Sequence, residues 1–127
     1  MNLEAIDHVA LAVRDVERSA QWYIDVLGLK QEHAEVWGGV PTFVGTGNAW
    51  IALFPLPEKP NPSGPDRAAS RVLHFAFRVD RKNFLQAQKE LKKRGIDFDF
   101  SDHEVSHSIY FRDPDEHRIE ITTYELK

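Results

Sequence analysis

The chain has 127 residues, of which 42% are hydrophobic and 28% charged, a composition typical of one globular domain with a buried core. Sixteen Lys and Arg against twenty Asp and Glu give a net charge of -4, so the field that attracts nucleic acid is missing. No cysteine is present, which excludes disulfides, thiolate nucleophiles and Cys-ligated metals. Without a signal-like start or an apolar run of about 20 residues, we expect a cytoplasmic protein with no membrane partner.

The first half of the chain predicts a strand, a helix and a hairpin. Residues 6–14 alternate between apolar and polar or small side chains, as a strand does. Asp15 follows as a helix cap, and apolar residues at helical spacing then run to Gly28, which ends the helix. Short strands around a tight turn at 45–48 complete this half. The residues at helical spacing are Val16, Ala20, Tyr23 and Leu27.

A proline-rich connector is predicted over about residues 55–66. Residues 55–65 hold five of the seven prolines, which excludes a central strand. We interpret this stretch as a semi-rigid connector that could let modules exchange between chains. A disordered surface loop is the alternative.

The second half of the chain repeats the first. An alternating strand at 72–79 is followed by the cap Asp80, a helix ended by Gly95, and a hairpin turn at 113–116. His74 stands where His8 stands in the first half, 74 − 8 = 66 residues later. Each half therefore reads βαβββ, and we predict one α+β domain over 1–127 with modules at about 1–55 and 67–127.

Strand alternation places three potential metal ligands on one face. His8 shares its strand face with Ala10 and Ala12, His74 lies opposite the bulky apolar face of its strand, and Glu120 faces away from Ile119 and Ile121. Two imidazoles and one carboxylate leave coordination positions open, which suits Fe(II), Mn(II) or catalytic Zn(II). The alternative is a pair of hydrogen-bonded structural histidines and an exposed strand charge.

These stretches resemble the vicinal oxygen chelate superfamily, which includes glyoxalase I, fosfomycin-resistance enzymes, bleomycin-binding proteins and extradiol dioxygenases. The resemblance covers essentially the whole chain. It implies a cupped mixed sheet, with helices on its outer face, around one divalent ion (Fe, Mn, Zn or Ni), and its ligand positions match His8, His74 and Glu120. The motifs that carry it are residues 8–15 with 22–23 and 27–29, residues 74–79, and residues 108–120.

Two departures from the family pattern narrow the choice of reaction. With the hairpin offset of 68, the position that matches Glu120 in the first half is 120 − 68 = 52, which is Ala52, so a four-ligand glyoxalase I is disfavoured. The basic loop of the fosfomycin enzymes has no counterpart in residues 97–106, and Ala10 stands where they often carry a hydroxyl. Assignment of the chain as a fosfomycin-resistance enzyme is therefore weakened too.

Tyr110 and His103 are the predicted catalytic residues. Tyr110 precedes Glu120 by ten residues and by alternation faces the cavity, where its hydroxyl could donate a hydrogen bond to a substrate oxygen. His103 could act as an acid or base near neutral pH, whereas His107 has the parity of Ile109 and should point away. Surface histidines and a simply packed tyrosine are the alternatives.

A substrate pocket is predicted from Trp50, Phe54, Arg78 and Arg118, which share the cavity face. The arginines could pair with an anionic substrate or merely cover the edge of the sheet.

We therefore predict a divalent-metal-dependent enzyme of the glyoxalase or dioxygenase type that acts on a small oxygenated substrate. A ring-cleaving dioxygenase is slightly favoured. The alternatives are a glyoxalase-like lyase and a drug-sequestering protein without catalysis, of the bleomycin resistance kind. Because each module leaves open sheet edges, we expect a homodimer, in which the ligands could come from one chain or from two.

Overall fold

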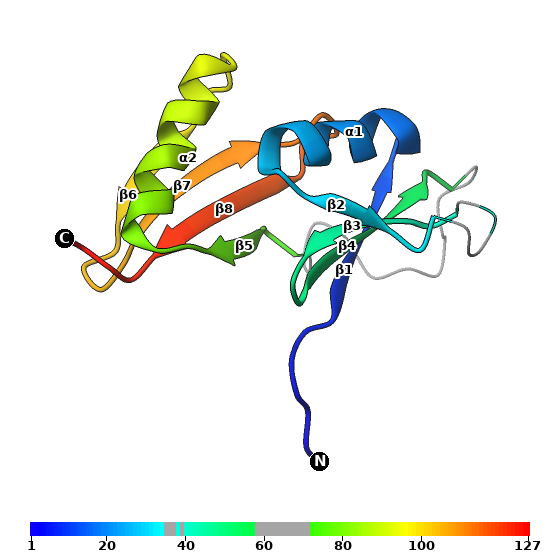
Figure 1. Ribbon diagram of the computed structural model, residues 1–127, viewed down its shortest axis with the longest axis horizontal. Coiled ribbons are helices and arrows are strands. Elements are labelled where there is room, and N and C mark those ends of the chain that lie inside the picture. The colour runs from blue at the N-terminus through cyan, green and yellow to red at the C-terminus, as the bar shows by residue number, and fades with distance from the viewer. Residues whose placement is uncertain (35–37, 39, 58–71) are drawn as a thin grey trace. The chain divides into compact units, whose positions relative to one another are not determined.

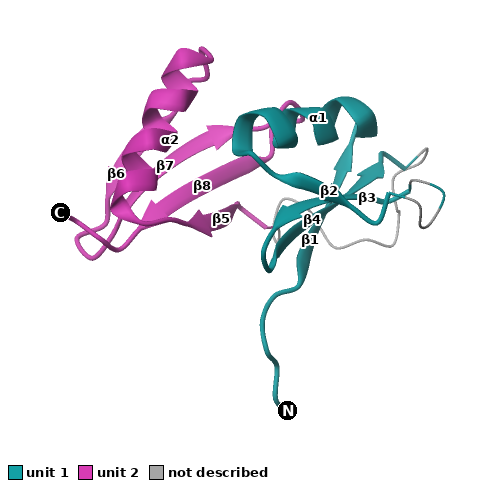
Figure 2. Cartoon of the chain, viewed as in Figure 1, with its two compact units in different colours: residues 1–66 teal, residues 67–127 magenta. Residues whose placement is uncertain are grey.

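The computed structural model describes residues 1–34, 38, 40–57 and 72–127 (Figure 1). The chain divides into two compact units, unit 1 with residues Met1–Asp66 and unit 2 with residues Arg67–Lys127 (Figure 2). Of the predicted connector, residues 58–66 lie outside the described residues.

Unit 1 is a four-stranded mixed sheet with one helix. The spatial order of its strands is β1-β4-β3-β2, in which β1 and β4 are parallel and the other pairs antiparallel. Its elements are β1 (His8–Val13), α1 (Val16–Leu27), β2 (Lys30–Glu32), β3 (Thr42–Thr46) and β4 (Ala49–Pro55).

Unit 2 repeats this topology in the order β5-β8-β7-β6, with β5 and β8 parallel. The predicted α+β fold of two tandem βαβββ modules is thereby confirmed. Neither helix described here has the length and apolar composition needed to cross a lipid bilayer. The elements of unit 2 are β5 (Phe75–Arg78), α2 (Arg81–Lys93), β6 (Asp99–Asp102), β7 (His107–Arg112) and β8 (Arg118–Thr123).

Both helices begin at the predicted aspartates. The Asp15 carboxylate accepts a hydrogen bond from the Arg18 amide at 3.1 Å, and that of Asp80 accepts one from the Asn83 amide at 2.8 Å. Each bond satisfies one amide that the first helical turn leaves without a partner. The capping residues thus fix where each helix leaves its strand, and with it the face of the sheet that the helix covers.

One face of each sheet is the apolar face that packs on the helix. In unit 1 the core includes Val13, Tyr23 and Ile51, all at most 1% exposed, and in unit 2 it includes Phe84 and Ile109, both fully buried. The predicted strand at 72–79 is shorter in the structure. Leu73 lies outside β5 and is 67% exposed, so the prediction that it belongs to the apolar face is wrong.

Gly45 allows a tryptophan to lie flat on the opposite face of unit 1. Gly45 pairs with Trp50 across β3 and β4. A Cβ atom at position 45 would come within 2.3 Å of Trp50 Cε3 and 2.5 Å of the Ala49 carbonyl oxygen. Only glycine leaves room for the indole there.

Candidate metal and substrate site

Unit 2 brings Glu120, Tyr110 and His74 together on one face of its sheet. Glu120 on β8 lies opposite Ala76 on β5 and Tyr110 on β7, and residues directly opposite each other in a sheet share a face. His74 immediately precedes β5, and its Nε2 lies 3.9 Å from Glu120 Oε1. Its ring meets Tyr110 edge-on, with centroids 5.6 Å apart. Two predicted metal ligands and the predicted catalytic tyrosine are therefore neighbours.

The Tyr110 side chain is surrounded by groups that keep its hydroxyl protonated. Burial raises the pKa of Tyr110 above its usual value, and the hydrogen bond and charge of Glu120 raise it further, against opposing effects of Ser108 and Arg118. The hydroxyl lies 3.0 Å from His103 Nε2, and the Arg118 guanidinium carbon lies 4.1 Å from the ring centroid. At neutral pH the phenol is thus a hydrogen-bond donor beside two groups that can orient it.

The chemistry of His74 and Glu120 fits a divalent ion. His74 Nδ1 is buried and has no hydrogen-bond partner among the described atoms, so no hydrogen bond fixes this ring nitrogen, while Nε2 faces Glu120. The 3.9 Å between Nε2 and Oε1 is too long for a hydrogen bond. It is nearer the roughly 3.4 Å between two donors that each lie ~2.1 Å from one tetrahedral ion.

His8 lies in β1 of unit 1 and shares a face of the sheet with Trp50 on β4, its pairing partner. Its Nδ1 lies 2.8 Å from an Asp7 carboxylate oxygen, while Nε2 makes no hydrogen bond to the described residues. A carboxylate behind one ring nitrogen is the usual arrangement of a metal-ligating histidine. Within each unit, the described residues contain no group of three His, Cys, Asp or Glu that could hold a metal. The set of His8, His74 and Glu120 stays a prediction.

Unit 1 repeats the aromatic contact of unit 2 without its polar groups. Phe43 pairs with Ala52 as Tyr110 pairs with Glu120, so Phe43 is the structural counterpart of Tyr110. The His8 ring lies edge-on to Phe43 with centroids 5.4 Å apart, close to the 5.6 Å between His74 and Tyr110. The comparison of the two halves of the sequence did not identify Phe43, because the hairpin that joins Tyr110 to Glu120 is one residue longer than the one that joins Phe43 to Ala52.

The other predicted pocket residues lie on their expected faces. Phe54 pairs with Ala12 and is 38% exposed. Arg78 lies over the ring of Tyr124, 4.8 Å from its centroid, toward the opposite end of β8 from Arg118. His107 faces the helix side, as expected, with its Nδ1 3.1 Å from Arg81 Nη1.

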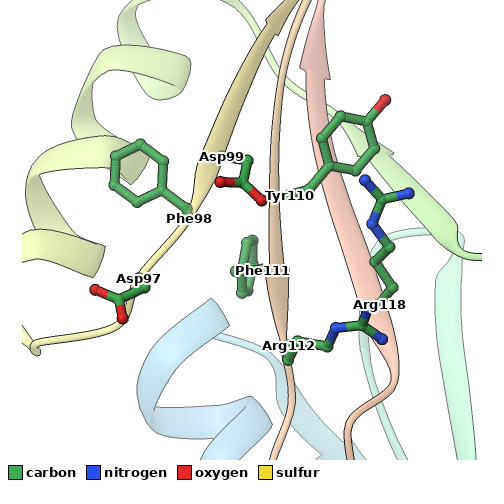
Figure 3. A pocket seen from close by; sticks show the side chains of 7 residues that line it. All are labelled: Asp97, Phe98, Asp99, Tyr110, Phe111, Arg112 and Arg118. Atoms are coloured by element: carbon green, nitrogen blue, oxygen red, sulfur yellow. The ribbon is translucent and has the colours of Figure 1, made fainter.

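A pocket of about 220 Å³ adjoins the Tyr110 cluster (Figure 3). It opens where β6 and β7 diverge, beyond their last pair, Asp99 with Tyr110. Asp97 and Asp99 lie on the β6 side of the pocket, and arginines lie on the β7 and β8 side. Sequence analysis missed this pocket because strand alternation does not predict where two strands separate. Its lining residues are Asp97, Phe98, Asp99, Tyr110, Phe111, Arg112 and Arg118.

The fold and the cluster define a class of paired-βαβββ proteins that carry a histidine and a glutamate on the open face of a sheet. Residues 5–121 match the model of the Glyoxalase/Bleomycin resistance protein/Dioxygenase superfamily, and the chain belongs to this superfamily. The resemblance inferred from residues 8–15, 22–23, 27–29, 74–79 and 108–120 is thereby confirmed.

The curated relatives of the chain are enzymes. A metallothiol transferase FosB from Staphylococcus epidermidis is 32% identical over an alignment that covers the whole chain and 87% of the relative. A catechol-2,3-dioxygenase from Bacillus subtilis is 33% identical over an alignment that covers 91% of this chain and 40% of the relative. A crystal structure of a glyoxalase/dioxygenase from Nostoc punctiforme has a TM-score of 0.76 and 28% identity, and the match covers 96% of this chain and 92% of that one. The prediction of an enzyme of this superfamily is confirmed at that level.

Proposed function

We propose that the protein is a metal-dependent enzyme for a small oxygenated substrate, with His8, His74 and Glu120 holding one divalent ion (Fe, Mn, Zn or Ni). The observation that supports this best is the cluster in unit 2, where Glu120 lies beside both His74 and Tyr110. Two imidazoles and one carboxylate leave positions open for a substrate oxygen or water.

A bound ion of this kind would supply Lewis acidity toward a substrate oxygen. The remaining work falls to side chains of the cluster. The protonated Tyr110 hydroxyl donates a hydrogen bond to the oxygen that gains negative charge. His103 orients that hydroxyl from 3.0 Å, and Arg118 adds positive charge on the face of the same ring.

The reaction that we propose is transfer of a thiol to an electrophilic carbon of the substrate, such as an epoxide carbon. A carbon–sulfur bond forms as the carbon–oxygen bond breaks, the electron pair stays on oxygen, and oxygen takes up the proton that the thiol released. This choice differs from the ring-cleaving dioxygenase that the sequence alone slightly favoured. It is supported by the FosB relative, which is matched over 87% of its length, against 40% for the dioxygenase.

Ring cleavage by a dioxygenase is the second candidate. The 33% identity to a catechol-2,3-dioxygenase favours it, as does the pairing of His103 with the Tyr110 hydroxyl, which could move a proton at a phenolic substrate. A glyoxalase-like lyase with a fourth carboxylate ligand is less well supported. Ala52, 1% exposed, occupies the register position in unit 1 that Glu120 occupies in unit 2.

The direct test combines metal analysis with a small substrate panel. Protein purified without chelator is analysed for metals, then incubated with fosfomycin and L-cysteine, with catechol, and with a hemithioacetal, and the products are identified by mass spectrometry. We expect the cysteine adduct of the epoxide. His74→Ala should lose metal, whereas His107→Ala, a histidine on the helix side of the same sheet, should keep it. A panel recovered unaltered, with equal binding to apo and metal-loaded protein, would indicate a sequestering protein instead.

A mixing experiment decides whether one chain or two build the metal site. His8→Ala and Glu120→Gln are each expected to abolish activity. If His8 of one copy joined His74 and Glu120 of another, a mixed dimer of the two variants would contain one intact site and regain activity. If each chain built its own site, every site in the mixture would stay defective. Sedimentation equilibrium of the same mixture tests the predicted homodimer.

A further inference from the structure

The two histidines of the proposed metal site differ in what lies behind their rings. An Asp7 carboxylate oxygen lies 2.8 Å from His8 Nδ1. The position that matches Asp7 in the second half of the chain is Leu73, because 73 − 7 = 66 is also the offset between the two histidines. Leucine offers no acceptor, and His74 Nδ1 has no hydrogen-bond partner among the described atoms. Within the described part of the chain, this ring nitrogen is therefore held in His8 and not in His74.

Asp7 can reach the ring of its neighbour because it lies outside the strand. Side chains that follow each other within a strand point to opposite faces of the sheet. β1 begins at His8, so this alternation does not constrain Asp7, and its carboxylate turns toward the ring of the next residue. The residue at which β1 begins thus determines which group stands behind His8.

The hydrogen bond determines which nitrogen of His8 carries the proton. An ionised carboxylate only accepts hydrogen bonds, so the proton of a neutral imidazole lies on Nδ1. Nε2 then carries a lone pair, which is the form that binds a metal ion. A half-turn of the ring would put a carbon atom in place of Nδ1 and break the bond, so Asp7 also holds the orientation of the ring. Phe43 lies edge-on to the same ring, with centroids 5.4 Å apart.

We propose that Asp7 is a positioning residue, which sets the tautomer and the ring orientation of His8 so that Nε2 is ready to bind the ion. The inference rests on the proposed function for the role of His8 as a ligand, whereas the tautomer is a property of the metal-free protein. The side chains are 84% exposed for Asp7 and 41% for His8, and water weakens a bond at such a site. We therefore expect a loss of metal affinity at the lower end of the roughly 10- to 100-fold that partners of this kind contribute.

The first measurement determines the tautomer without any metal. Long-range ¹H–¹⁵N spectra of the metal-free, ¹⁵N-labelled protein distinguish a protonated from an unprotonated ring nitrogen. They are recorded at about pH 8, where an ordinary histidine is neutral, and His8→Ala assigns the His8 signals. We expect the proton of His8 to lie on Nδ1 in the parent and to be shared between both nitrogens in Asp7→Ala. His74, which lies in the other unit, is the internal reference and should not change.

The second measurement is the affinity for Zn²⁺, determined by competition with a colorimetric chelator. Asp7→Ala should weaken Zn²⁺ binding about tenfold. Asp7→Glu keeps a carboxylate at this position and should restore most of the affinity. Asp25→Ala is the matched control, because it removes the same charge from another exposed carboxylate of unit 1, one that accepts a hydrogen bond from Gln21 at 2.8 Å. It should change neither the affinity nor the tautomer of His8.

Failure of the positioning role and failure of the proposed function give different results. A His8 tautomer that is the same in the parent and in Asp7→Ala, or equal Zn²⁺ affinities of Asp7→Ala and Asp25→Ala, would overturn the positioning role even in a protein that binds Zn²⁺ through His8. Ring signals of His8 and His74 that Zn²⁺ leaves unchanged in the parent would overturn the proposed metal site. The positioning role would fall with that site, but the dependence of the tautomer on Asp7 would persist and identify the metal site as the cause.

Discussion

Replacing Gly45 with alanine should destabilise unit 1 and disturb the site face of its sheet. The added Cβ would lie 2.3 Å and 2.6 Å from the Trp50 ring atoms Cε3 and Cδ2, and 2.5 Å from the Ala49 carbonyl oxygen. Ordinary contacts are 3.4–4 Å, so the ring must move by about 1 Å and the backbone must also shift. Overpacking of this kind costs about 1–3 kcal/mol.

The measurement is thermal unfolding by differential scanning calorimetry. For a chain of this size, about 4 °C of Tm is lost for each 1 kcal/mol, so we expect a decrease of about 4–12 °C. Gly47→Ala is the control from the same hairpin, because nothing lies within 4 Å of its added Cβ. Its φ of +53° should cost only about 1 kcal/mol.

A double variant separates the two clashes. Trp50→Ala in the Gly45→Ala background removes the ring contact but not the contact with the Ala49 carbonyl, so it should recover only part of the loss. An alanine at position 45 that left Tm within about 1 °C of the parent would refute the reasoning, because no ring or backbone shift of this size is free.

Three further outcomes are expected. Tyr110→Phe should lower kcat by about 10- to 100-fold and the free energy of unfolding by only about 1 kcal/mol, because it removes one hydroxyl and keeps the ring. Tyr124→Phe, the same change on an exposed ring, should alter neither quantity. Asp113→Ala should cost about 2–4 kcal/mol in urea unfolding, since its buried carboxylate accepts from the Asp115 and His117 amides. Glu120→Gln should lower the bound metal measured by elemental analysis, and retention of full metal content would remove the proposed ligand set.

Features that depend on strand alternation could be predicted from the sequence. The parity of residues along a strand is local, so it correctly placed Tyr110 on the face of Glu120 and His107 on the helix side. Helix starts were equally predictable, because the caps Asp15 and Asp80 act within three residues of themselves.

Features that depend on where strands begin, end or separate could not be predicted. Leu73 alternates correctly with Phe75 but lies outside β5, so its exposure followed from the length of the strand. The charged pocket arises because β6 and β7 lose their pairing beyond Asp99 and Tyr110. The sequence offset of 68 makes Ala52 the counterpart of Glu120. The observed strand registers make Phe43 the counterpart of Tyr110, and these two residues are 110 − 43 = 67 residues apart.

The two modules differ in the polar groups that they would contribute to the proposed metal centre. Each unit sets a histidine edge-on to an aromatic ring, but only unit 2 adds a hydroxyl on Tyr110 and the carboxylate of Glu120. In the proposed metal centre, a carboxylate at position 52 would add a second carboxylate to the two imidazoles and Glu120, and would occupy a coordination position that the proposed reaction leaves to a substrate oxygen. The small buried side chain of Ala52, which pairs with Phe43, leaves this position without a ligand group. The loss of polar groups from one module is therefore as much a part of the proposed chemistry as their presence in the other.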